Sequence, residues 1–209
     1  MASPAGPRRG APAAPLAPSA IGEDDIAYPP PGPELRLASL RGKLLHHLFE
    51  RLPSVSAEQR RESAMLWLER SAAGEERDFR SDVADDALRI TDDPRFATLF
   101  APETLAEAPI AAVVGEGVVV AGTVDRLVID DDLILVADFK TGRKVPASAS
   151  EVPLAHLRQM AAYRAALRTI FPDRPVEAAL LYTSGPALHL LPSDLLDSHD
   201  PGASPELIE

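Results

Sequence analysis

Two carboxylates and one ammonium group lie close together in the middle of the chain. Asp125 ends the segment Gly-Thr-Val-Asp, and the segment Asp-Phe-Lys supplies Asp138 and Lys140 thirteen residues later. Carboxylate oxygens bind divalent cations, and a lysine beside them can contact a phosphate that the cation polarises. An Asp-x-Lys triplet alone is common by chance, but the combination predicts a metal-dependent phosphodiesterase.

The segment 133–140 that carries two of these groups is apolar until its last three residues, which is typical of a central buried strand. Side chains alternate across a strand, so Asp138 and Lys140 point to one face and Phe139 to the other. A charged group on a hydrophobic face costs several kcal/mol unless it has a partner or a metal. We therefore expect Asp138 and Lys140 to be paired.

A hairpin should bring the second acid to the first. The segment 118–125 predicts the preceding strand, and the acidic run 130–132 predicts the turn that joins it to the next. Asp125 then approaches Asp138. An ion pair of Asp125 with a neighbouring basic residue, at an ordinary strand end, explains the same pattern without any metal.

A helix predicted over 154–171 carries two polar residues of interest. Its apolar positions are Leu157, Met160, Ala161, Leu167 and Ile170. Gln159 and Tyr163 lie four residues apart and share a face, where they contact a DNA strand or orient Lys140. A surface hydrogen bond and a half-buried aromatic ring are the simpler interpretation.

Three motifs together resemble the RecB-type branch of the PD-(D/E)XK nucleases. They are Gly-x-x-Asp125-Arg126, Asp138-Phe-Lys140-Thr141 and Gln159-x-x-x-Tyr163. Residues 16–19, 41–46, 96–100, 105–110 and 171–181 are similar to the C-terminal nuclease domain of the AddA subunit of bacterial helicase-nucleases. The resemblance covers roughly residues 14–192 and is far more specific than any single motif.

The resemblance implies a restriction-endonuclease-like α/β fold, with a mixed central sheet flanked by helices. It implies a Mg²⁺ or Mn²⁺ site whose ligands are His46, Asp125 and Asp138. Lys140 would assist hydrolysis, and Gln159 and Tyr163 would complete the catalytic signature. The histidine rests on the Arg-Gly-x-x-x-His pattern, because periodicity does not distinguish His46 from His47. Glu107 matches an acidic position of the family and is either an auxiliary ligand or a surface charge.

The order of predicted elements is helices, three strands, a helix and two strands, which suits one α/β domain with a mixed sheet. Residues 1–38 hold nine of the 21 prolines and are expected to form an extended or disordered linker. Residues 39–192 are expected to form the nuclease domain, and 193–209 an acidic tail.

The chain contains no cysteine, which excludes disulfides and the iron-sulfur cluster of several relatives. No apolar run approaches the roughly 20 residues needed to cross a bilayer, so no membrane partner is expected. These features fit a cytoplasmic protein, and the resemblance implies a bacterial, nucleoid-associated one.

A net charge of −11 argues against tight autonomous binding to DNA. Five basic residues cluster around the predicted site and either line a strand path or belong to an ordinary solvated helix face: Arg143, Lys144, Arg158, Arg164 and Arg168. No phosphate-binding Gly-Lys-Thr loop is present, so the chain alone cannot drive unwinding. The resemblance implies an exonuclease domain in double-strand-break repair that receives single-stranded DNA from a helicase motor and works with an AddB-like subunit. A free-standing exonuclease and a non-catalytic docking module are the alternatives.

Overall fold

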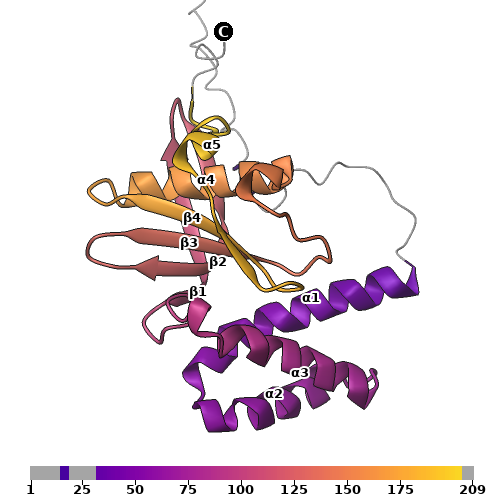
Figure 1. The fold of residues 1–209 in the computed structure, drawn as a ribbon. Helices are drawn as coiled ribbons and strands as arrows, with labels where there is room; N and C mark the ends of the chain where they lie inside the picture. The colour runs from indigo at the N-terminus through magenta and orange to yellow at the C-terminus, as the bar shows by residue number, and fades with distance from the viewer. Residues whose placement is uncertain (1–14, 19–31, 204–209) are drawn as a thin grey trace, which may run out of the picture.

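A five-stranded mixed sheet forms the centre of the computed structural model, which describes residues 15–18 and 32–203 (Figure 1). The elements are, in chain order, α1 (Pro33–Arg51), α2 (Ala57–Ser71), α3 (Arg77–Thr91), β1 (Leu105–Val114), β2 (Val118–Ile129), β3 (Ile134–Lys140), α4 (Leu154–Ile170), β4 (Val176–Tyr182), β5 (Ala187–Leu190) and α5 (Ser193–Asp197). Short 3-10 turns follow α1 and α3 and precede α4.

The strands lie in the order β1-β2-β3-β4-β5, and only β3 and β4 run parallel. Parallel neighbours need a crossover connection, and α4 supplies it. The other pairs are antiparallel and are joined by short turns. This mixed sheet with helices on both sides confirms the predicted α/β architecture.

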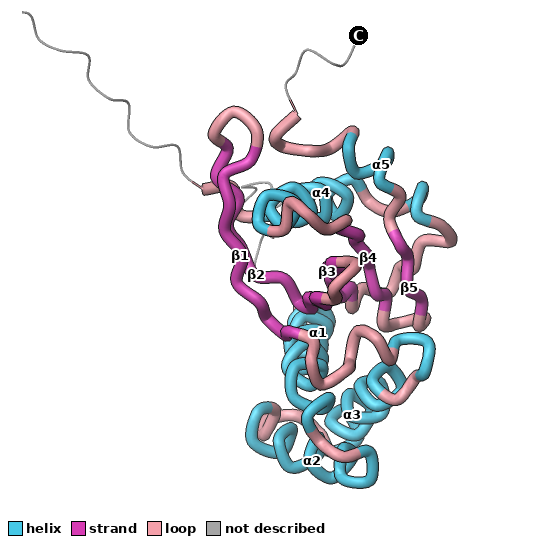
Figure 2. The backbone as a smooth tube through the Cα atoms, turned by 90° about the vertical axis from the view of Figure 1, so that its left-hand side faces the viewer, coloured by secondary structure: helices cyan, strands magenta, loops and turns pink. Residues whose placement is uncertain are grey.

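Helices cover both faces of the sheet (Figure 2). One core lies between the sheet and α4, and a second lies between the sheet and α1, α2 and α3. The side chains of β3 alternate between them, with Val136 in the α4 core and Ala137 and Phe139 in the core of the three-helix layer. The period-two pattern of this strand therefore separates Asp138 from Phe139 as predicted.

The register aligns three acids across three neighbouring strands. Because Ala106 pairs with Arg126 and Ala108 with Val124, Glu107 of β1 lies opposite Asp125 of β2. The β2–β3 ladder begins with Arg126 opposite Ala137, so the next position in register is Asp125 opposite Asp138. No ladder pair forms there, and the two strands diverge.

The part of β2 that β3 leaves uncovered is paired with a segment from the N-terminal region. The Leu16 amide donates to the Val119 carbonyl at 2.7 Å, and the Ala121 amide donates to the Leu16 carbonyl at 3.0 Å. Leu16 also packs against the α4 core. The polar backbone of this strand edge is thereby satisfied.

Both terminal segments contain helix, where an extended linker was expected at the N-terminus and an acidic tail at the C-terminus. Helix α1 begins at Pro33, so the last six residues of 1–38 are helical, and proline is favourable at a first helical position. At the other end, Leu196 of α5 is 1% exposed, because this apolar residue packs into the α4 core. The expectations for residues 1–14, 19–31 and 204–209 lie outside the described residues. Within the part of the chain that the structure describes, no helix is long and apolar enough to span a membrane.

Candidate active site

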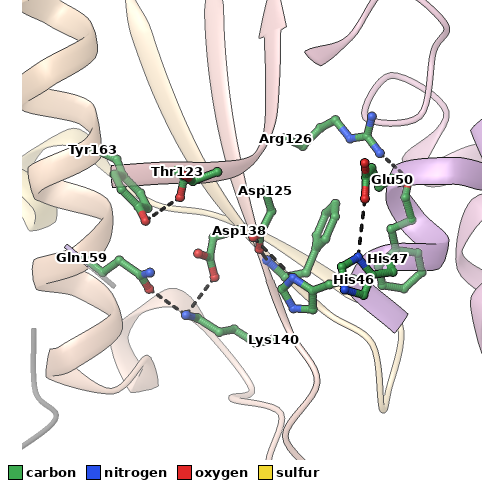
Figure 3. A network of polar contacts seen from close by, with 12 residues as sticks. His46, His47, Glu50, Thr123, Asp125, Arg126, Asp138, Lys140, Gln159 and Tyr163 are labelled. Carbon is green, nitrogen blue, oxygen red and sulfur yellow. Dashed lines mark hydrogen bonds and ion pairs between the residues drawn. The ribbon is translucent and has the colours of Figure 1, made fainter. Parts of the chain in front are cut away.

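Asp125 lies where β2 and β3 diverge and bonds to groups on both sides. Its Oδ2 accepts a hydrogen bond from the Phe139 amide at 2.6 Å, which replaces the missing ladder bond. Its Oδ1 lies 3.4 Å from Nδ1 of His46. The carboxylate thus connects the end of β3 to α1 (Figure 3).

His46 reaches Asp125 because the apolar face of α1 packs against the sheet. Its ring contacts Phe139 edge-on, with centroids 5.9 Å apart. Burial alone would lower the pKa of His46, but the hydrogen bond to Asp125 and the charges of nearby acids raise it. His46 is therefore close to several carboxylates, an arrangement that suits a metal ligand.

The close packing of α1 depends on Gly42. A Cβ atom at this position would lie 2.7 Å from Oγ1 of Thr141, the residue that follows Lys140. Only glycine lets the helix backbone come this near to the end of β3. One turn farther along α1, this approach sets how far His46 reaches.

Glu107 is the third member of a potential metal-binding group. Ligand atoms of His46, Glu107 and Asp125 all lie within 4.8 Å of one another. Glu107 has φ +48°, a left-handed backbone that is uncommon for residues other than glycine and that often occurs at functional sites. Burial and the charge of Asp125 raise the pKa of its carboxyl group.

Asp138 and Lys140 point toward α4, on the other face of the sheet from His46. The Lys140 ammonium lies 2.8 Å from Oδ2 of Asp138 and donates to Oε1 of Gln159 at 2.7 Å. Burial and the neighbouring charge of Asp125 raise the pKa of Asp138 to about 6. Two carboxylates that disfavour each other's charge are stabilised by a cation between them.

Tyr163 has a positioning contact rather than a free hydroxyl. Its OH donates to the Thr123 carbonyl of β2 at 2.8 Å, two residues before Asp125. Burial raises the pKa of Tyr163 to about 12, so the hydroxyl remains a neutral donor. Of the two residues expected either to contact a DNA strand or to orient Lys140, Gln159 bonds to the Lys140 ammonium, whereas Tyr163 bonds to β2.

Arg126, next to Asp125, is 2% exposed and anchors the three-helix layer. Its guanidinium donates to the carbonyl of Phe49 in α1 and to Oγ1 of Thr104, and lies over the ring of Phe100. The contact with Phe49 fixes α1 one turn beyond His46.

A cavity of about 500 Å³ opens at this site and is lined by residues of α1 together with Glu107, Asp125 and Thr141. One imidazole nitrogen and several carboxylate oxygens form a donor set that Mg²⁺ or Mn²⁺ accepts. Burial, and after it the charge of Asp125, raises the pKa values of the Glu107 and Asp138 carboxyl groups, and a bound cation would offset the repulsion among these acids. The residues present therefore fit a divalent cation.

Two of the basic residues considered for a strand path are paired with an acid of this chain instead. Arg164 is 8% exposed and donates to the carbonyl of Val176 and to Asp197 of α5. Arg168 pairs with the same carboxylate. Both arginines hold α5 against α4. The prediction failed for them because their partner, Asp197, is distant in the sequence and no local pattern reveals it. The sequence left open whether Glu107 is an auxiliary metal ligand or a surface charge. The register of the β1–β2 hairpin places it opposite Asp125.

One protein-family model matches most of the chain. The model of the PD-(D/E)XK nuclease superfamily matches residues 23–200. No curated protein matches the chain. Solved structures do match, among them the crystal structure of SSO0001, which is 14% identical, covers 78% of this chain and 82% of its own, and has a TM-score of 0.35. By the extent of the family match, the chain belongs to the PD-(D/E)XK nuclease superfamily.

Proposed function

We propose that the chain is a metal-dependent deoxyribonuclease that hydrolyses phosphodiester bonds of a DNA strand. The observation that carries this proposal is the convergence of Asp125 with His46 on one side and with Asp138 and Lys140 on the other. A bound Mg²⁺ or Mn²⁺ would polarise the scissile phosphate and lower the pKa of an attacking water. Its ligands would come from His46, Asp125 and Asp138, with Glu107 as a further candidate.

The protein's own groups would position and stabilise the reacting phosphate. Lys140 is held between Asp138 and Gln159, so its ammonium is oriented before a substrate binds. An oriented cation stabilises charge that develops on phosphate oxygens. Tyr163 acts at one remove, because its bond to the Thr123 carbonyl fixes β2 beside Asp125.

The broader setting that we propose is the nuclease domain of an AddA-type helicase-nuclease in double-strand-break repair. The support is the RecB-type motif set and the net charge of −11, which suits a nuclease that receives its strand from a motor. An AddB-like subunit would be its partner, in the bacterial cytoplasm. A reading frame that joins this segment to a helicase motor would support the setting, and a frame without one would favour a free-standing exonuclease.

The catalytic proposal is tested with the purified chain, end-labelled single-stranded DNA and Mg²⁺ or Mn²⁺. Asp138→Ala should reduce the cleavage rate by at least about a hundredfold, because it removes both a ligand and the partner of Lys140. Asp132→Ala is the matched control, since Asp132 is an exposed acid in the turn before β3. Cleavage that is equal in the two variants would contradict the assignment of Asp138.

A further inference from the structure

The cavity at the site continues along α1 beyond the candidate metal ligands. Its α1 lining begins at Ala38 and ends at His47. The nine helical steps between these two residues rise about 14 Å, whereas one strand of duplex DNA carries a phosphate about every 3.4 Å. The wall is therefore long enough to contact phosphates other than the scissile one.

Among the described residues that line this cavity, Lys43 is the only lysine or arginine. It lies one helical turn before His46, and its side chain is exposed. Across the described ranges 15–18 and 32–203, Lys43 takes part in no ion pair and no side-chain hydrogen bond. Within these ranges, no acidic side chain neutralises its charge.

Many other basic residues of the helices already have acidic partners. Ion pairs join Arg41 to Asp86, Arg60 to Asp92, Arg61 to Asp85, Arg89 to Asp86 and Arg164 to Asp197. Lys43 has no such partner among the described residues, and it lines the same cavity as the carboxylates of Glu107 and Asp125. Its position matches the need to hold an anionic strand next to that cluster.

Ser39 extends the same wall by one further turn. Ser39 and Lys43 are four residues apart and share a helix face, and both line the cavity. Together with His46, they present a hydroxyl, an ammonium and an imidazole on successive turns. Serine and lysine are frequent partners of phosphate oxygens.

We propose that α1 binds the backbone of the DNA strand beside the scissile bond, with Lys43 on a neighbouring phosphate and Ser39 on one farther along. This inference rests on the proposed nuclease function. Because the contacts are to phosphates, they position the strand without reading its sequence. Lys43 is a substrate-binding residue, separate from the metal ligands.

The test compares Lys43→Ala with Arg70→Ala in steady-state cleavage of single-stranded DNA at several salt concentrations. Arg70 is exposed on α2, so both variants lose one positive charge but only one of them alters the cavity. Lys43→Ala should raise KM about fivefold and leave kcat unchanged, as expected for one exposed charged contact. The slope of log(kcat/KM) against log salt should become shallower by about 0.7, the value for one phosphate of a single strand.

Two further variants complete the test. Lys43→Arg should restore the wild-type KM, and Lys43→Glu should raise KM beyond Lys43→Ala with an unchanged midpoint of thermal unfolding. If KM and the salt slope of Lys43→Ala equal those of Arg70→Ala, α1 is not the wall that holds the strand. If the wild-type chain neither binds nor cleaves DNA, the nuclease function fails and this inference fails with it.

Discussion

Gly42→Ala is expected to weaken metal binding, because the added methyl group separates α1 from the end of β3. The new Cβ would lie 2.7 Å from Oγ1 of Thr141, whereas ordinary contacts begin at 3.4 Å. Helix or threonine must therefore move by roughly 0.7 Å, and overpacking of this kind costs about 1–3 kcal/mol. Because His46 lies on the next turn of the same helix, the displacement alters its distance to Asp125.

Metal affinity is the direct measurement, by calorimetric titration of Mn²⁺ into the purified chain. Displacement of a ligand or its support typically reduces metal affinity about 10-fold to 100-fold, and Gly42→Ala should fall in this range. Gly142→Ala is the matched control, since a Cβ there would meet no atom within 4 Å.

A double-mutant cycle separates this contact from general destabilisation. Thr141→Ala removes the Oγ1 atom that the new methyl group would strike, so Gly42→Ala should cost much less affinity in a Thr141→Ala background. If the loss is the same with and without Thr141 Oγ1, the close approach does not set the position of His46.

Three further predictions concern residues around the site. Tyr163→Phe should lower the free energy of unfolding in urea by about 1 kcal/mol, because the Thr123 carbonyl loses its donor. Leu16→Ala should lower the free energy of unfolding by about 1 kcal/mol through lost packing on the α4 core. A decrease no greater than that caused by substitution of an exposed residue would show that the segment around Leu16 is dispensable for stability. Burial and the charge of Lys140 lower the pKa of His156 to about 4, below its ordinary 6.5. As pH falls, the unfolded chain protonates His156 at a higher pH than the folded chain does, so the free energy of unfolding decreases between pH 6.5 and pH 4. The midpoint of thermal unfolding of His156→Gln should therefore depend less on pH across that window than the wild-type midpoint does.

The sequence revealed the elements of the fold through local signals. The apolar run before Asp138 predicted a buried strand, and the structure places it third of five, with neighbours on both edges. The acidic turn 130–132 predicted the hairpin that brings Asp125 toward Asp138. Gln159 and Tyr163 were predicted either to contact a DNA strand or to orient Lys140, and in the structure Gln159 bonds to the ammonium.

Long-range contacts account for what the sequence did not predict. Arg164 resembled a surface cation, but Asp197 from α5 binds it, and no local pattern links residues so far apart. The alignment of Glu107 with Asp125 was available in principle, because a hairpin through Gly115 and Gly117 fixes that register. The left-handed backbone of Glu107 could not be predicted, since nothing in its residue type requires it.

The two helical layers reach the site from opposite faces of the sheet. His46 arrives from the three-helix layer, whereas Gln159 arrives from α4 and holds Lys140. The groups meet only where β2 and β3 diverge, so neither layer docked alone assembles the full set. A chain in which one layer has not docked consequently lacks part of the candidate site. Formation of the candidate site is thus coupled to the docking of both helical layers on the sheet.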